Sequence, residues 1–118
     1  MKDLNLIKPT ASLLEASKTI LLSKSRCIII IDNEKVLGVF SEGDLLRAIL
    51  KGIDLYSPVK PLVNINFHYL HGLDYEKAWS IFKSTGITLL PIITKSFDLI
   101  DTITLQDMMN NNVVLIKC

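Results

Sequence analysis

The fold of this 118-residue chain is decided by the stretch Cys27-Ile-Ile-Ile-Ile-Asp-Asn-Glu-Lys-Val-Leu-Gly-Val-Phe-Ser-Glu-Gly-Asp-Leu-Leu-Arg47. Cys27 to Ile31 is a continuous apolar, β-branched run, which is typical of a strand covered on both faces. Asp32 to Lys35 is a short polar turn, and Val36 to Phe40 returns as a second strand. Ser41 to Asp44 then opens a helix. The stretch therefore predicts a hairpin that leads directly into a helix.

A helix is also expected before the hairpin. Thr10 or Ser12 is a suitable N-cap, and Ser23 follows the last apolar residue of the pattern. The apolar residues of this first helix are spaced as one face: Leu13, Leu14, Ala16, Ile20 and Leu21. The helix that begins near Ser41 is expected to end at Gly52. Its predicted apolar face consists of Leu45, Leu46, Ile49 and Leu50.

The same order of elements starts again after a connector over residues 53–60, which is bounded by Pro58 and Pro61. Helix-spaced apolar residues end at Gly86, and a turn over residues 94–98 separates two apolar runs. The predicted elements of this second half are a strand over Ile65–Leu70, a helix with Tyr75, Ala78, Trp79 and Phe82 on one face, strands over Ile87–Ile93 and Leu99–Ile103, and a helix from Thr104 through Met108 and Met109.

The two halves are related by a constant offset. Ser41 and Thr104 are 63 residues apart, as are Asp44 and Asp107, and the same offset places Ile30 on Ile93. Ala16 corresponds to Ala78 at an offset of 62 residues, so we expect one inserted residue in the helix-to-strand loop. A shared order of elements at one offset indicates an internal repeat.

This repeat predicts a mixed α/β (α+β) protein made of two pseudo-symmetric βαββα units packed through their sheets. The expected boundaries are residues 1–60 for the first unit and 61–112 for the second. Residues 113–118 are either the start of a following domain or a closing strand, because Val113-Val-Leu-Ile116 is an apolar, strand-like run.

Composition and charge exclude several classes of function. Apolar residues make up 49% and charged residues 21%, which supports a packed interior. The formal net charge of +1 argues against nucleic acid as a partner. The sequence contains no apolar run long enough to cross a membrane and no secretory signal, so we expect a cytoplasmic protein. His68 and His71 lack the companions of a zinc set, so no metal site is expected.

A hydroxyl followed three residues later by a carboxylate recurs where a strand meets a helix, as Ser41/Asp44 and Thr104/Asp107. One interpretation is helix capping, in which the hydroxyl accepts a hydrogen bond from an early helix N–H. The other is a nucleotide site, because a helix N-terminus suits a phosphate and a carboxylate can accept from both hydroxyls of a ribose. The sequence leaves both open.

The segment Gly38-Val-Phe-Ser41-Glu-Gly-Asp44-Leu-Leu-Arg47 resembles the signature of CBS domains, which are named after cystathionine β-synthase. Leu13-Leu-Glu-Ala16 resembles the first-helix pattern of the family, and Leu90-Pro91-Ile-Ile93 the second-unit strand. The resemblance covers about Leu4 to Met109. It implies a Bateman module, in which paired CBS units form two clefts, commonly dimerise, and bind adenine nucleotides to regulate an attached enzyme or transporter.

The resemblance also implies roles for particular residues. Asp44 and Asp107 would accept from the ribose hydroxyls, while Ser41 and Thr104 would contact phosphate. The base pocket would use the start of the strand after the first helix of each unit, and the strand before that helix would line the cleft. These positions are Arg26, Cys27 and Ile28 with Ile7 and Lys8 in the first unit, and Leu89, Leu90 and Pro91 with Phe67 and His68 in the second.

The two predicted sites are not equal. Where the first unit has Gly38, the offset gives Asp101 in the second, which adds a side chain and a negative charge near the expected phosphate. We therefore favour the first site. Arg47 lies one turn beyond Asp44, where it is either a solvated helix-face arginine or a contact for an anionic ligand.

A narrower resemblance links residues 38–55 to CBS pairs attached to sugar nucleotidyltransferases or sugar-phosphate isomerases. It implies that the chain is a fragment of a nucleotidyltransferase-type enzyme, cut before a glycine-rich loop. The chain itself carries no Walker-type loop, nucleophile elbow or metal set, so we expect a regulatory module and no catalysis. The expected ligand is AMP, ADP, ATP or a related nucleotide or sugar nucleotide, with no required cofactor and with a homodimer as the assembly. The alternative is a structural dimerisation scaffold with degenerate clefts.

Overall fold

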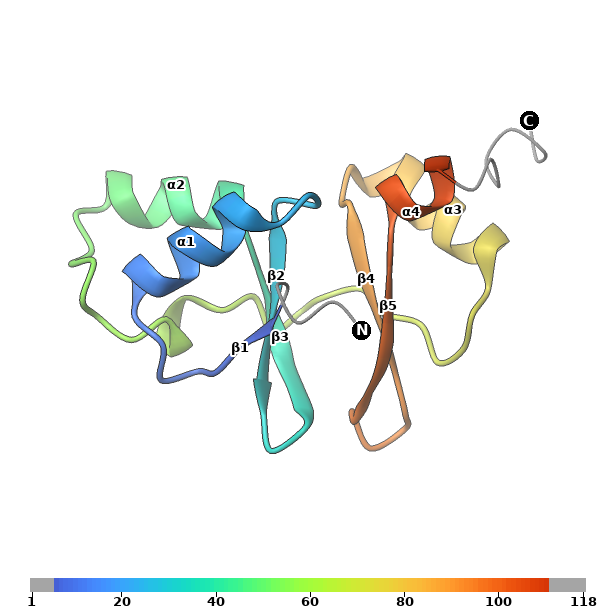
Figure 1. The fold of residues 1–118 in the computed structure, drawn as a ribbon, viewed down its shortest axis with the longest axis horizontal. Helices are drawn as coiled ribbons and strands as arrows, with labels where there is room; N and C mark the ends of the chain where they lie inside the picture. The colour runs from blue at the N-terminus through green and yellow to red at the C-terminus, as the bar shows by residue number, and fades with distance from the viewer. Residues whose placement is uncertain (1–5, 111–118) are drawn as a thin grey trace.

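The computed structural model describes residues 6–110 and divides them into two units that lie side by side (Figure 1). The first unit contains β1 (Leu6–Ile7), α1 (Leu13–Leu22), β2 (Cys27–Asp32), β3 (Lys35–Ser41) and α2 (Glu42–Leu50). The second contains α3 (Tyr75–Thr85), β4 (Leu89–Ile93), β5 (Leu99–Thr104) and α4 (Leu105–Asn110), and a short 3-10 helix, η2 (Lys60–Leu62), lies between. The predicted mixed α/β fold class is confirmed.

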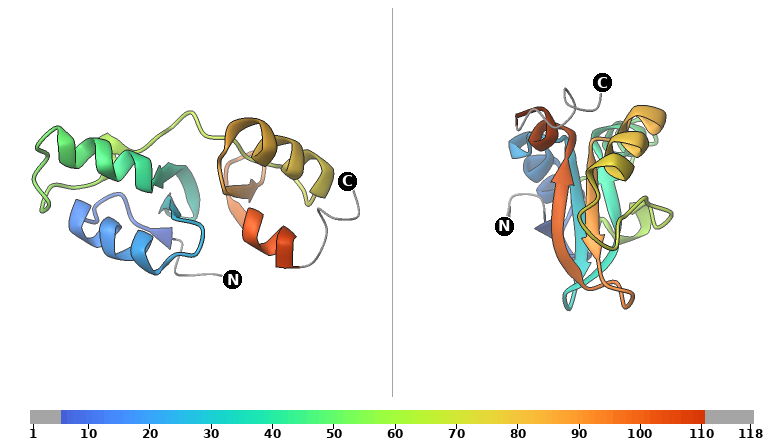
Figure 2. Two further views of the ribbon diagram at one scale, coloured as in Figure 1. Left: turned by 90° about the horizontal axis from the view of Figure 1, so that it is seen from above. Right: turned by 90° about the vertical axis from the view of Figure 1, so that its right-hand side faces the viewer.

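The strands of each unit form a small sheet. In the first, β1 pairs in parallel with β2 and β2 pairs antiparallel with β3; in the second, β4 pairs antiparallel with β5. The sheets face each other in the centre, and the helices lie outside them as the pairs α1/α2 and α3/α4 (Figure 2). No described helix is both long and apolar enough to cross a membrane.

The register of the hairpins locates the inserted residue of the repeat. Cys27 pairs with Ser41, and Leu89 pairs with Thr104, so β2 corresponds to β4 at an offset of 62 while β3 corresponds to β5 at 63. Both hairpins have a bulge, after Ile30 in β2 and after Ile92 in β4. The extra residue therefore lies in the second hairpin turn, and its predicted position in the helix-to-strand loop is wrong. Ile30 corresponds to Ile92, one residue before the predicted Ile93.

Local sequence explains where the helices begin and end. Ser12 caps α1 and Ser41 caps α2, each in a capping box with the acidic residue three positions later. Asp74 caps α3 through the N–H of Lys77, and Gly86 ends that helix in the left-handed conformation that glycine adopts without strain.

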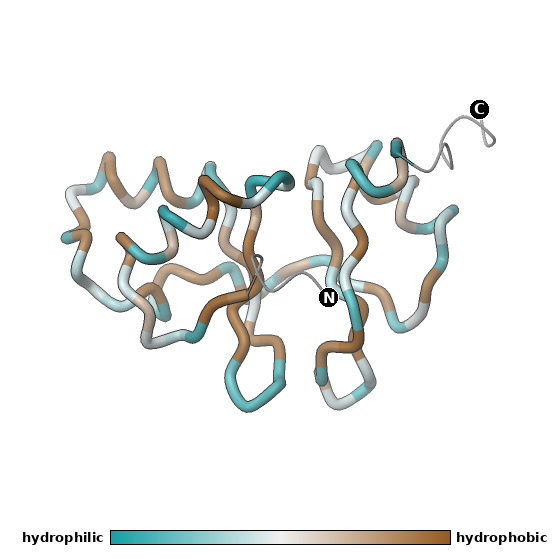
Figure 3. Tube along the Cα trace, in the orientation of Figure 1, coloured by the Kyte–Doolittle hydropathy of each residue, from teal (hydrophilic) through white to brown (hydrophobic). Residues whose placement is uncertain are grey.

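The core is divided among three groups of buried side chains. Ile28 and Ile30 point from β2 into the core of the first unit, and Leu90 belongs to the corresponding core of the second. Cys27 and Ile29 point the other way, into a central cluster shared by both units; its other members are Val36, Leu89 and Ile93. Strands β2 and β4 are apolar along nearly their whole length (Figure 3) because both of their faces are covered.

The two hairpin tips are also joined. Lys35 and Asp98 form an isolated antiparallel bridge, and the Lys35 Nζ lies 2.9 Å from the Asp98 carboxylate. Val36 N–H donates to the Phe97 carbonyl at 2.8 Å, and Leu99 N–H donates to the Glu34 carbonyl at 3.1 Å. The units are thus tied together at the ends of the hairpins as well as through the central cluster.

Two further predictions about elements are wrong. The strand over Ile65–Leu70 does not form; isolated bridges at Asn64 and Leu70 hold the ends of this segment. The side chain of Asn64 accepts from the Asn66 N–H at 3.0 Å, and such a local turn competes with a strand ladder.

The other wrong prediction is the apolar face of α2. Ala48 is its buried residue and Leu45 is partly buried, whereas the side chains of Leu46, Ile49 and Leu50 are 55%, 48% and 85% exposed. The helix therefore packs on its own unit through a narrow stripe and leaves most of its predicted apolar face uncovered.

Candidate functional site

A cleft of about 320 Å³ lies between the two units. One wall comes from the first unit, at the start of β2, the end of β3 and the first turns of α2. The other comes from the segment that leads into the second unit and from the α3–β4 loop. The lining residues are Cys27, Val39, Ser41, Asp44 and Arg47 on the first wall, and Asn64, Asn66, Phe67, His68 and Thr85 to Leu89 on the second.

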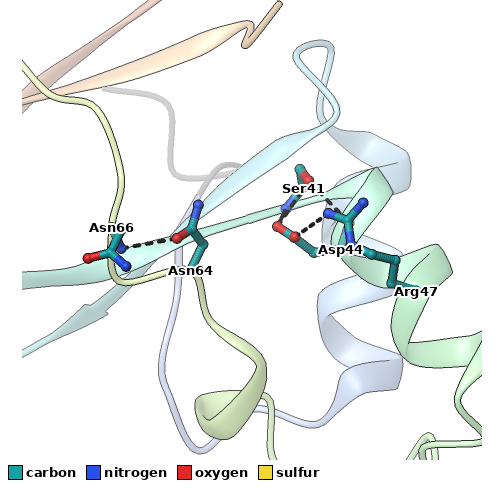
Figure 4. A network of polar contacts seen from close by, with 5 residues as sticks. All are labelled: Ser41, Asp44, Arg47, Asn64 and Asn66. Carbon is teal, nitrogen blue, oxygen red and sulfur yellow. Dashed lines mark hydrogen bonds and ion pairs between the residues drawn. The ribbon is translucent and has the colours of Figure 1, made fainter. Parts of the chain in front are cut away.

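The Asp44 carboxylate is the most highly bonded group of the first wall (Figure 4). Its Oδ2 accepts from the Ser41 N–H at 2.9 Å and from the Ser41 Oγ at 3.0 Å, while Ser41 Oγ accepts from the Asp44 N–H at 3.2 Å. These three hydrogen bonds are the ones that the capping interpretation predicts. The same carboxylate lines the cleft with 21% of its side chain exposed, so capping and ligand binding are compatible.

Arg47 balances the charge of Asp44. Its Nη2 lies 2.7 Å from Asp44 Oδ1, one turn along α2, and two-thirds of its side chain is exposed. A carboxylate oxygen has room for two hydrogen bonds, so Oδ1 retains an acceptor position for a ligand hydroxyl. The guanidinium is placed where it can pair with either Asp44 or an anion in the cleft.

The second wall is held against the first by a close backbone approach. Val39 and Asn64 exchange both backbone hydrogen bonds, with N–H donors 3.1 and 2.9 Å from the opposite carbonyls. Gly38 makes this possible, because a Cβ built on it would lie 2.5 Å from Val63 Cγ1 and in hard contact with the Asn64 backbone. Beyond Asn64 the segment carries Asn66, Phe67 and His68 along the cleft.

Cys27 contributes packing to the cleft and no reactivity. Burial raises the pKa of the Cys27 thiol to about 12, and the neighbouring Asp44 carboxylate adds to that rise. Because the thiolate is the nucleophilic form, a thiol with this pKa is inert near neutrality. Within residues 6–110, no cluster of three or more histidine, cysteine or acidic side chains could hold a metal ion.

The structure brings together seven of the residues that the resemblance singled out. Ser41, Asp44, Arg47 and Cys27 meet Phe67, His68 and Leu89 in the inter-unit cleft. This cleft therefore takes its second wall from the other unit. Ile7 and Lys8 lie instead in a separate hollow with Glu15 and Thr19.

The remaining candidates lie elsewhere. Ile28, Leu90 and Pro91 are fully buried. Arg26 lines a neighbouring groove. Thr104 and Asp107 make the capping contacts of α4, with Asp107 N–H 2.9 Å from Thr104 Oγ1 and Thr104 N–H 3.3 Å from the Asp107 carboxylate. Asp101, the counterpart of Gly38, is exposed and accepts from the Thr102 N–H at 2.7 Å.

Sequence reasoning did not identify Val39, Asn64, Asn66 or the loop from Thr85 to Thr88. An offset of 62 for β2 and β4 would have indicated part of this loop, since it pairs Arg26 with Thr88 and Cys27 with Leu89. The two asparagines carry no such signal, because the segment that contains them has no regular pairing.

Residues 1–51 match the family model of the CBS domain. A 75-residue stretch, 61% of this chain, is 37% identical to an uncharacterised protein of Helicobacter pylori and spans only 22% of that protein's length.

Similar solved structures include the CBS domain protein PAE2072 of Pyrobaculum aerophilum complexed with AMP, at a TM-score of 0.79 and 19% identity over 95% of this chain and 88% of that one. A putative acetoin utilisation protein of Vibrio cholerae gives a TM-score of 0.80 and 22% identity, over 96% of this chain and 85% of that one. The cytosolic domain of the Mg²⁺ channel MgtE in complex with ATP gives a TM-score of 0.69 and 18% identity, over 90% of this chain and 44% of that one.

These likenesses extend over nearly the whole chain, whereas the sequence match to the family covers its first half. Residues 1–51 are thus similar in sequence to the CBS domain, and the described part of the chain has the fold of a CBS domain pair.

Proposed function

We propose that this chain is a regulatory module that binds an adenine nucleotide, or a related nucleotide or sugar nucleotide, in the inter-unit cleft. The observation that carries the proposal is the placement of Ser41, Asp44 and Arg47 at the start of α2, facing an aromatic and amide-bearing wall from the other unit. The AMP and ATP bound by two proteins of the same fold support it.

The cleft offers groups for each part of such a ligand. Asp44 Oδ1 would accept from a ribose hydroxyl, and the Ser41 hydroxyl at the N-terminus of α2 would contact a phosphate. Phe67 would pack against the base, with backbone groups of the flanking segment as hydrogen-bond partners. Arg47 would turn from Asp44 toward the phosphate.

Regulation would follow because both units contribute walls to the cleft. A ligand that touches α2 of one unit and the α3–β4 loop of the other has an affinity that depends on the relative placement of the units. Binding therefore favours one placement, and an attached or partner enzyme that senses that placement responds to the ligand. A sugar nucleotidyltransferase-type enzyme in the cytoplasm is the proposed target, following the resemblance of residues 38–55.

The proposal is tested by thermal unfolding in the presence of AMP, ADP, ATP, S-adenosylmethionine, nicotinamide dinucleotides and CMP- or UDP-sugars. A ligand at 100 times its Kd stabilises the native state by about 2.7 kcal/mol. For a domain of this size that raises Tm by several degrees. Unchanged Tm values across the whole panel, from folded protein, would reject the sensor and leave the scaffold as the function.

We also propose a homodimer formed through the helices of the first unit. Leu21 and Leu22 at the end of α1 and Leu46, Ile49 and Leu50 on α2 are exposed leucine and isoleucine side chains on neighbouring helices. Leu46, Ile49 and Leu50 are three and four residues apart, so they form an exposed apolar patch on one face of α2, and such a patch marks an interaction site. We propose a second copy of the chain as the occupant, because most soluble oligomers are homo-oligomers in which both subunits use the same surface.

Leu46→Glu is expected to weaken this dimer at least tenfold, because it places a charge within the apolar patch. Light scattering after size-exclusion chromatography measures the mass over a dilution series. Leu73→Glu is the matched control, since Leu73 is also exposed but lies outside the patch, before α3. Equal masses for the two variants would contradict the proposed interface.

A further inference from the structure

Three aromatic side chains, Phe67, Tyr69 and Phe97, pack together beside the inter-unit cleft, and we name them the aromatic cluster. Phe67 lines the cleft. Its ring centroid lies 5.5 Å from that of Tyr69 and 6.2 Å from that of Phe97, and the Tyr69 and Phe97 centroids are 5.4 Å apart. The pairs are tilted or edge-to-face, arrangements that aromatic rings prefer. The aromatic cluster therefore runs from the wall of the cleft to the turn between β4 and β5.

The backbone of Phe97 is strained. Its φ of 68° lies in the left-handed region, which a bulky residue rarely occupies and which persists only where the surrounding structure holds it. Thr94 holds the turn, because its carbonyl accepts from the Phe97 N–H at 2.9 Å and its Oγ1 accepts from the Asp98 N–H at 3.0 Å. The contacts to Phe67 and Tyr69 hold the ring. Phe97 is thus fixed at both its backbone and its side chain.

The repeat shows what this conformation does for the backbone. Glu34 lies 63 residues before Phe97 and is also left-handed, with a φ of 69°. The Phe97 carbonyl accepts from the Val36 N–H, and the Glu34 carbonyl accepts from the Leu99 N–H. We name these two reciprocal hydrogen bonds between the hairpins the tip joint. Its backbone is symmetric, and its asymmetry lies in the side chains, an exposed glutamate on one turn and a phenylalanine packed on other rings on the second.

We propose that the aromatic cluster links the inter-unit cleft to the tip joint: Phe97 positions Phe67 for the ligand, and the bound ligand in turn stabilises the joint. This inference rests on the proposed function and adds to it the place where the two units respond. Phe97 does not line the cleft, so it acts through Phe67 as a positioning residue.

The way in which Phe67 is held supports this link. The segment that carries it is paired only at its ends, at Asn64 and Leu70, so the position of the Phe67 ring depends on its side-chain neighbours. A base packed on Phe67 would hold that ring against Phe97, whose carbonyl binds Val36 of the first unit. Because coupling between two sites is reciprocal, a joint that strengthens ligand binding is strengthened by the ligand to the same extent.

The first test compares the wild type with Phe97→Gly, Phe97→Tyr and Glu34→Gly by calorimetry, with the nucleotide that raises Tm most. Phe97→Gly removes the ring and leaves a residue that adopts the left-handed conformation without strain, so the fold should persist. Its affinity should fall about fivefold, which is the size of the contribution of one aromatic pair. Phe97→Tyr keeps the ring and should retain the wild-type affinity. Glu34→Gly is the matched control, because it relaxes the same conformation on the other turn, and its affinity should be unchanged.

The second test is hydrogen exchange at the Val36 and Leu99 amides, which donate the two bonds of the tip joint. The Val59 amide is the reference, because it donates to the Ala11 carbonyl at 2.8 Å, outside the cleft and the joint. In the wild type, saturating nucleotide should slow exchange of the two joint amides about threefold more than it slows exchange at Val59. This excess protection should be lost in Phe97→Gly at saturating nucleotide.

Three results would overturn this inference and leave the proposed function intact. They are wild-type affinity in Phe97→Gly, equal losses of affinity in Phe97→Gly and Glu34→Gly, and joint amides that gain no more protection than Val59 in the wild type. Failure of the wild type to bind any ligand of the wider panel would instead reject the proposed function itself.

Discussion

Asp44→Ala is expected to lower nucleotide affinity by about a hundredfold while the chain remains folded. The variant removes the acceptor proposed for the ribose and releases Arg47 from its partner at 2.7 Å. A hydrogen bond to a charged group contributes about 1.5–3 kcal/mol, which corresponds to roughly a ten- to hundredfold change in Kd for each bond. Calorimetry with the nucleotide that gives the largest Tm shift measures the effect.

The repeat provides a control for this variant in the same molecule. Asp107 caps α4 as Asp44 caps α2, but it does not line the inter-unit cleft described above. Each alanine substitution removes one capping contact and should cost about 1 kcal/mol in the free energy of unfolding. Only Asp44→Ala should impair binding. Equal losses of affinity in the two variants would show that the effect comes from stability, and unchanged binding in Asp44→Ala would refute the site.

Gly38→Ala is expected to destabilise the protein by about 2–3 kcal/mol, at the upper end of what an added methyl group costs in a packed interior. The new Cβ would meet Val63 Cγ1 at 2.5 Å and would collide with the Asn64 backbone. The connecting segment must then move away from β3 and lose the paired hydrogen bonds between Val39 and Asn64. Denaturant unfolding gives the free energy, and the same variant should bind nucleotide more weakly because the second wall of the cleft shifts.

Gly72→Ala is the matched substitution, since a Cβ at Gly72 has no neighbour within 4 Å. It should be neutral or slightly stabilising, because alanine restricts the unfolded chain. A Gly38→Ala protein as stable as Gly72→Ala would mean that the close approach of the segment at Asn64 is not required.

The order of the elements could be predicted because each one is specified locally. Ser12 and Ser41 start helices, Gly86 ends one, and Cys27 to Ile31 is apolar on both faces of its strand. The position of the inserted residue of the repeat could not be predicted in the same way. Two hairpins with turns of different length keep the same polar character, and only the pairing of Leu89 with Thr104 fixes the offset of β4.

Other features depend on what covers a surface, which one chain's sequence does not specify. Leu46, Ile49 and Leu50 have helix spacing and predict a buried face, yet the core of the first unit is completed by Ala48 and Leu45. The segment after Asn64 has alternating residues typical of a short strand, but it pairs only at its two ends, with β3 at Asn64 and with β4 at Leu70, and forms no ladder between them.

The sequence could predict several residues of the candidate site, but it could not predict which of them share one cleft. Ser41 and Asp44 follow from the motif at the start of α2, and Phe67 and His68 from the resemblance. That these four lie in one cleft, while Ile7 and Lys8 lie in another hollow, follows from how the two units face each other. That arrangement depends on long-range packing through the central cluster.

The central cluster has a further consequence for how the units find each other. Cys27, Ile29 and Val36 from one unit and Leu89 and Ile93 from the other are all nearly or fully buried there. A separate single unit would expose these side chains to water and would have to meet its counterpart by diffusion. The tether between them sets an effective concentration in the millimolar range, independent of how dilute the protein is. The cleft is therefore assembled at any protein concentration, so occupancy by the proposed ligand would not depend on how dilute the protein is.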